Sequence, residues 1–113
     1  MLTIDKLTEY GADVEQGLAR CANNEALYLR LVGLCIQELS SDELGKALKA
    51  GDFDKAFDIA HKLKGGVNNL ALTPVAVPVS ELTERLRGKV PGDYKPLYDE
   101  IVKETAALSA LMD

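Results

Sequence analysis

The chain has 113 residues, of which 47% are hydrophobic and 27% charged, and its formal net charge is −5. This length is enough for one domain whose core needs neither disulfides nor metal. The negative charge argues against nucleic-acid binding, because phosphates require a basic surface. No apolar run approaches the roughly 20 residues of a membrane span, and the first residues lack the layout of a signal peptide. We therefore expect residues 1–113 to form one cytoplasmic domain that contacts neither nucleic acid nor membrane, and we expect a monomer.

The two cysteines, Cys21 and Cys35, are too few for a disulfide framework. Both lie among apolar residues, which indicates reduced thiols in the core. The chain has one histidine and no CxxC motif, a poor basis for a zinc site. We therefore expect neither a bound metal nor a cofactor.

The first third of the chain predicts three helices. Thr3 can cap a short helix over residues 4–10, and a second helical piece spans residues 13–20. Asn24 then caps the longer stretch EALYLRLVGLCIQELS. Its apolar residues recur at helical spacing, and they are Leu27, Leu31, Leu34 and Ile36 or Leu39.

The middle of the chain predicts a short helix and a long one. Residues 41–48 form the short helix, and the sequence AGD at 50–52 is a break signal. Asp52 can cap the long helix, which we expect to run from Phe53 to about Leu72.

Two more helices are predicted in the last third. Thr73 and Pro74 mark a helix boundary, and Pro78 either begins the next helix or kinks it. That helix shows an apolar face of Val75, Val79, Leu82 and Leu86. A loop at 88–93 precedes a helix over 94–112, which places Leu97, Ile101, Ala106 or Thr105, and Leu108 on one side. Long helices, short loops and no strand signal predict an all-α fold, an antiparallel four-helix bundle with short additional N-terminal helices.

The single histidine, His61, lies within the long helix. On a helical wheel the predicted core face consists of Ala56, Ile59, Ala60, Leu63, Val67 and Leu70. His61 points almost to the opposite side, so we expect it to be exposed. The residues on its side of the helix are Asp54, Phe57, Lys64, Gly65 and Asn68.

Two glycines follow His61, and they allow two interpretations. The sequence KLKGG could end the helix with a glycine C-cap. However, the apolar spacing continues in phase through Gly65 and Gly66, which favours a helix that runs on to the break at Thr73. In that case Gly65 leaves a bare patch beside His61, where another molecule can approach closely. Gly66 lies toward the edge of the core face, where it would let a neighbouring helix pack tightly.

The side chains around His61 suit phosphoryl chemistry. A neutral imidazole is a nucleophile near neutral pH, since its reference pKa is about 6.5. Lys64 could neutralise and bind a phosphoryl group on His61, and Asn68 could donate a further hydrogen bond. No second histidine, acidic pair of evident role or nucleotide-binding glycine loop accompanies them. Any Mg²⁺ for phosphoryl transfer would therefore come from a partner.

The stretch AHKLKGGVNNLAL resembles the signature of histidine-containing phosphotransfer (HPt) domains. The matching positions are His61, Leu63, Lys64, Gly65, Asn69 and Leu70. Upstream, the segment from 10 to 32 is similar to bacterial members of this family, with Asp13, Gly17, Leu18, Arg20 and Tyr28 in the usual order. The departures are Gly66, which replaces a larger small residue, Ala71, where the family commonly has glycine, and an unusual Pro78.

This resemblance implies a four-helix bundle that carries an exposed phosphohistidine at His61. Such a domain relays phosphoryl groups to and from the aspartate of response-regulator receiver domains, and a hybrid histidine kinase is another expected partner. It has no kinase activity of its own, and the receiver supplies Mg²⁺ and most of the catalytic groups. Gly65 would then leave room for the active-site loops of the receiver.

Two other classes of function remain open from the residues alone. One is a helical interaction module whose His61 is never phosphorylated. The other is an enzyme, such as a phosphohistidine hydrolase or a metal-dependent hydrolase. The single histidine and the missing acidic cluster speak against the enzyme.

Overall fold

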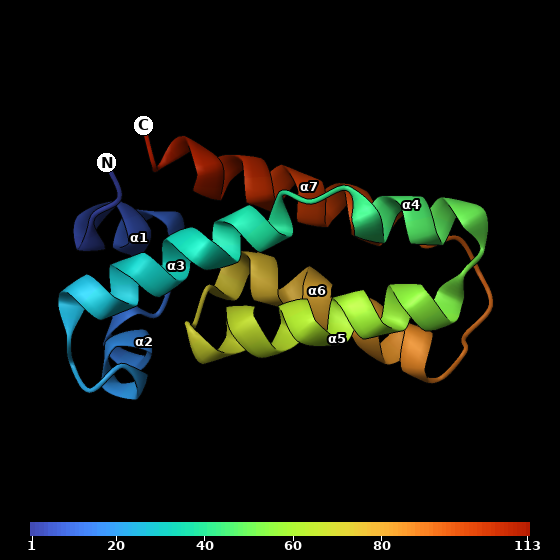
Figure 1. The fold of residues 1–113 in the computed structure, drawn as a ribbon, viewed down its shortest axis with the longest axis horizontal. Coiled ribbons are helices and arrows are strands. Elements are labelled where there is room, and N and C mark those ends of the chain that lie inside the picture. Colours follow the sequence, from blue (N-terminus) through green and yellow to red (C-terminus); the bar gives the residue numbers. More distant parts are fainter.

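Seven helices and no strand make up the computed structural model, which describes all of residues 1–113. The helices are α1 (Ile4–Tyr10), α2 (Val14–Arg20), α3 (Glu25–Leu39), α4 (Glu43–Ala50), α5 (Phe53–Asn69), α6 (Thr73–Arg87) and α7 (Lys95–Ala110). Figure 1 shows α3 and α4 following each other along the molecule, while α5, α6 and α7 run back and forth beside them. These four arms form the predicted antiparallel bundle, and α1 and α2 lie at one end of it. No helix is long and apolar enough to cross a membrane.

Polar side chains cap three of the seven helices at the predicted positions. Thr3, Asn24 and Asp52 each accept a hydrogen bond from the backbone N–H three residues later. Asp13, predicted as the first residue of its helix, is instead the N-cap of α2. Helix α4 begins at Glu43, two residues later than predicted, and ends at Ala50.

The core is aliphatic, and the apolar residues predicted for α3 are partly confirmed. Leu27 and Leu34 of α3 are 39% and 46% exposed. Leu31 is partly buried, and the predicted Ile36 and Leu39 are buried. The rest of the buried side is formed by Tyr28, Val32 and Cys35, which were not predicted. Spacing alone allowed either stripe, because α3 is apolar over much of its circumference and the neighbouring helices decide which side is covered. Cys21 and Cys35 are buried free thiols, as predicted.

Helices α5 and α6 share the most extensive contact in the bundle. The predicted core face of α5 is confirmed, apart from a partly exposed Ile59. The predicted face of α6 is also buried, and it consists of Val75, Val79, Leu82 and Leu86. This packing places the polar edges of the two helices side by side.

The end of α5 differs from the prediction. The helix ends at Asn69 rather than near Leu72, because Ala71 adopts a left-handed φ of 56°. Polar groups from other elements bind the carbonyls of this turn. The hydroxyl of Tyr28 donates to the oxygen of Leu70 at 3.0 Å, and the guanidinium of Arg20 donates to the oxygens of Asn68 and Asn69. The helix therefore ends at a left-handed alanine, where the sequence offers no glycine to mark the end. Hydrogen bonds from α2 and α3 stabilise this turn.

The last two helices show where α6 begins and which residues of α7 face the core. Helix α6 begins at Thr73 and continues through a buried Pro78, so the alternative that the helix begins at Pro78 is wrong. The loop after α6 leads to α7, which is slightly shorter than the predicted 94–112. Of the two residues proposed for its core side, Thr105 is buried and Ala106 is exposed.

Candidate functional site

His61 lies near the middle of α5 and is exposed, as its position on the wheel predicted. Phe57, one turn earlier, stacks on the imidazole with ring centroids 5.5 Å apart. The helix continues through Gly65 and Gly66, since neither has a positive φ. The imidazole is therefore held on regular helix, away from the negative end of the helix dipole.

The two glycines of the motif have different surroundings. A Cβ added at Gly65 would meet no atom within 4 Å, so the surface beside His61 is open at this point. A Cβ at Gly66 would lie 3.5 Å from the Sγ of Cys35, which is an ordinary contact distance. Gly65 thus leaves the predicted bare patch. Gly66 faces α3, but the approach of α3 does not require a glycine there.

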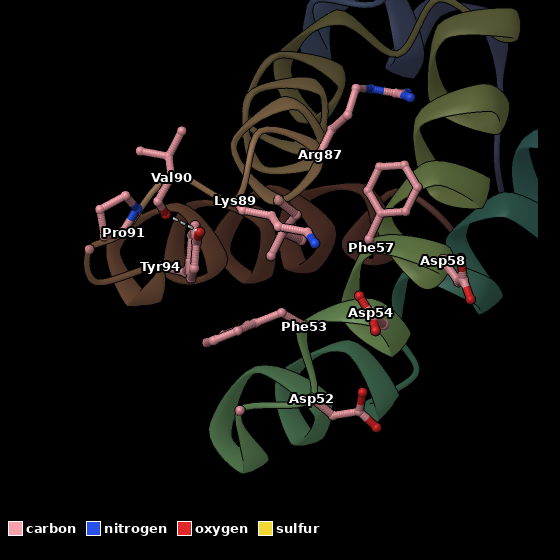
Figure 2. A pocket seen from close by; sticks show the side chains of 13 residues that line it. Asp52, Phe53, Asp54, Phe57, Asp58, Arg87, Lys89, Val90, Pro91 and Tyr94 are labelled. Atoms are coloured by element: carbon pink, nitrogen blue, oxygen red, sulfur yellow. Dashed lines mark hydrogen bonds between the residues drawn. The ribbon is translucent and has the colours of Figure 1, made fainter.

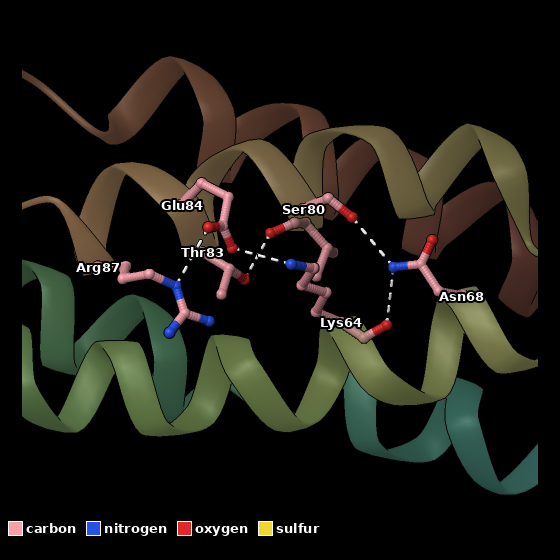
Figure 3. A network of polar contacts seen from close by, with 7 residues as sticks. Lys64, Asn68, Ser80, Thr83, Glu84 and Arg87 are labelled. Carbon is pink, nitrogen blue, oxygen red and sulfur yellow. Dashed lines mark hydrogen bonds and ion pairs between the residues drawn. The ribbon is translucent and has the colours of Figure 1, made fainter.

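Lys64 lies between α5 and α6, where it forms an ion pair. Its Nζ donates to Oε2 of Glu84 on α6 at 2.8 Å. The other oxygen of Glu84 accepts from Nε of Arg87 at 3.1 Å, so one carboxylate holds two cations (Figure 3). These contacts, the hydrogen bond from Lys64 first among them, lower the pKa of Glu84 below its ordinary value. Glu84 therefore stays ionised at neutral pH.

Asn68 also contacts α6. Its amide nitrogen donates to the backbone oxygen of Lys64 at 2.9 Å and to Oγ of Ser80 at 3.1 Å (Figure 3). Both amide protons are used within the chain. A hydrogen bond from Asn68 to a group on His61 would require one of these bonds to break.

Arg87 of α6 lies against the turn of α5 that precedes His61. Its guanidinium carbon lies 5.0 Å from the ring centroid of Phe57, the ring that stacks on His61. Arg87 and Phe57 border a hollow of about 730 Å³ that Asp54 and Asp58 also line. Figure 2 shows these side chains. Glu84 and Arg87 are absent from the predicted site, because only the packing of α6 on α5 brings them there. In the sequence, Glu84 and Arg87 indicate only an ordinary i,i+3 ion pair on one helix, with nothing that links them to His61.

A second hollow begins on the other side of the bare patch. It measures about 720 Å³ and is bordered by Gly65 and Asn68 of α5, Arg20 of α2 and Val77 of α6. Val77 is 62% exposed, although it is apolar. The surface around Gly65 is therefore concave as well as unobstructed. No group of three or more His, Cys, Asp or Glu side chains is arranged to hold a metal ion.

Comparison with known protein families matches residues 4–111 to the Hpt domain. The match spans nearly the whole chain, so the chain belongs to the Hpt domain family. Members of this family are phosphotransfer modules without kinase activity that interact with response regulators or kinases. The chain accordingly has a phosphotransfer role in two-component signalling. No significant match was found among curated proteins or among solved structures.

Proposed function

We propose that His61 accepts a phosphoryl group and exchanges it with the aspartate of a response-regulator receiver domain. The observation that carries this proposal is the exposed imidazole on regular helix, one turn before a glycine with open space around it. His61 is also the only histidine in the chain. A phosphohistidine could form at no other residue.

The chemical step uses the ring nitrogen that carries no proton. Its lone pair attacks the phosphorus of the receiver's aspartyl phosphate. A P–N bond forms while the P–O bond to the aspartate breaks, and the aspartate leaves as a carboxylate with that electron pair. The proton on the other ring nitrogen stays there during transfer. The reverse step returns the phosphoryl group to the carboxylate.

The residues near His61 have separate roles in this proposal. Lys64 is three residues after His61 and so on the same side of α5, where its ammonium can bind phosphoryl oxygens. Asn68, one turn further on, adds a hydrogen bond if its amide is released from Ser80. The Mg²⁺ that such transfers use would come with the acidic residues of the receiver. Stacking against Phe57 holds the imidazole for attack.

The test is a transfer assay with a phosphorylated receiver domain and three variants of the chain. Wild type and Gly65→Ala should both take up the phosphoryl group, since a single methyl at Gly65 meets no atom in the chain. Gly65→Leu should fold at least as stably but obstruct the receiver, and should transfer at least about tenfold more slowly. His61→Gln should take up none. A Gly65→Leu protein that transfers at the normal rate would contradict the role of Gly65.

A further inference from the structure

We propose that Glu84 competes with the phosphoryl group on His61 for Lys64 and Arg87, and thereby keeps the phosphohistidine readily transferable. This inference rests on the proposed function of His61. It assigns to a residue outside the HPt signature control over the equilibrium of the transfer. Glu84 is a positioning residue in this scheme, since it acts only through the two cations that it holds.

The first observation is how the charges are arranged on the edge between α5 and α6. Glu84 accepts from Lys64 at 2.8 Å and from Arg87 at 3.1 Å, using a different oxygen for each. Two positive charges and one negative charge leave a net charge of +1 on this cluster. Without Glu84 the same two cations would present +2.

The second observation is that each cation lies on the same side of the bundle as His61, within one neighbouring residue of it. Lys64 follows it by three residues on α5, so the two side chains are helix neighbours. Arg87 lies over Phe57, which itself contacts the imidazole. Only Nε of Arg87 donates to Glu84, and its Nη groups make no hydrogen bond within the chain. These Nη groups could therefore donate to a new partner such as a phosphoryl oxygen without giving up a bond within the chain.

A phosphoryl group brings about −1.5 to −2 charges to this place. Lys64 can turn toward it only by weakening its bond to Glu84, and the carboxylate repels the new negative charge. Both effects raise the free energy of the phosphorylated state relative to the free state. The unphosphorylated state meanwhile keeps its ion pairs. Glu84 therefore favours return of the phosphoryl group to a receiver.

Glu84→Gln tests this inference with a well-matched control in Glu81→Gln. Glu81 is three residues earlier on α6, is similarly exposed, and pairs only with Arg85. Both variants lose the same charge, but only one of them frees Lys64 and Arg87. Each is mixed with a phosphorylated receiver that exchanges phosphoryl groups with the wild-type chain, and the share on each protein is measured at equilibrium.

We expect Glu84→Gln to raise the equilibrium constant for phosphohistidine formation about two- to fivefold, the range of exposed ion-pair interactions. Glu81→Gln should stay closer to wild type, and Glu84→Asp, which keeps the charge, should restore the wild-type value. Equal shifts in the two glutamine variants, or a decrease in Glu84→Gln, would overturn the inference while leaving the proposed function intact. A wild-type chain that takes no phosphoryl group from any receiver would instead refute the proposed function, and this inference with it.

Discussion

The ring of Phe57 lies against the imidazole of His61, with the two planes inclined by only 23°. The two residues are one turn apart on the exposed side of α5, and Arg87 covers the same phenyl ring. An exposed side chain ordinarily samples several rotamers. Contact with a flat neighbour restricts the imidazole and favours a fixed direction of attack.

Replacing Phe57 should therefore slow phosphoryl transfer. Phe57→Leu keeps most of the apolar contact but loses the flat face, and we expect transfer to be about two- to tenfold slower, the size of an aromatic pair interaction. Phe57→Ala should show the same loss and in addition unfold more easily, by about 1 kcal/mol, because Phe57 is partly buried. Transfer rates and urea unfolding separate the two effects. A Phe57→Leu protein with the wild-type rate would show that the stacking is incidental.

Lys64→Ala should change transfer much more than stability. Its pair with Glu84 is partly exposed, so we expect the free energy of unfolding to fall by less than about 1 kcal/mol. Loss of the ammonium should reduce the equilibrium share of phosphohistidine several-fold. Lys62→Ala is the control, since Lys62 directly follows His61 in the sequence but points to another side of α5. Equal behaviour of the two variants would contradict a specific role for Lys64.

Two glycine-to-alanine substitutions should change stability in opposite directions. A Cβ at Gly17 would lie 2.5 Å from Cε1 of Tyr28 and 2.7 Å from the oxygen of Leu70. Gly17→Ala should therefore destabilise the fold by about 1–3 kcal/mol, despite the better helix propensity of alanine. Gly65→Ala meets no neighbour and should stabilise the fold by about 0.5–1 kcal/mol. Thermal unfolding measures both, and a stabilised Gly17→Ala protein would disprove the close approach of α2 to the end of α5.

Stability should fall in alkaline solution because of buried acids in the core. Burial raises the pKa of the Cys35 thiol from 9.0 to about 11, and that of Tyr28 from 10.0 to about 12. Above pH 9 the unfolded chain loses protons that the folded chain retains, so the free energy of unfolding decreases as pH rises toward 11. For Cys35 the expected loss is about 1–3 kcal/mol. Urea unfolding at pH 8 and pH 10.5 should show a smaller decrease in Cys35→Ala than in wild type, and equal decreases would contradict the assignment.

Much of this architecture was predictable from local sequence because the signals act within a few residues. The caps Thr3, Asn24 and Asp52 each bind a backbone N–H three positions away, and the core face of α5 follows from spacing alone. The exposure of His61 follows from the same spacing. These features depend on residues that are close in sequence, and packing against the other helices leaves them unchanged.

Features that depend on other helices were predicted less well. The buried side of α3 depends on what packs against it, and Ala71 takes a left-handed φ in a turn that Arg20 and Tyr28 stabilise from elsewhere. Glu84 is the clearest case at the site, because its partner Lys64 is 20 residues away in sequence. A family signature read along one helix does not include what the adjacent helix contributes.

The most direct test of the central claim is to locate the phosphoryl group after transfer from a receiver labelled with ³²P. Wild type and His61→Gln are incubated with the same labelled receiver, separated, and treated with acid or with alkali. We predict label on the wild-type chain that is lost in acid and kept in alkali, as expected of a P–N bond, and none on His61→Gln. Because His61 is exposed, the variant should keep its stability within about 0.5 kcal/mol, so an unfolded protein would not explain the loss. Label that persists on His61→Gln, or a wild-type chain that no receiver labels, would contradict the account.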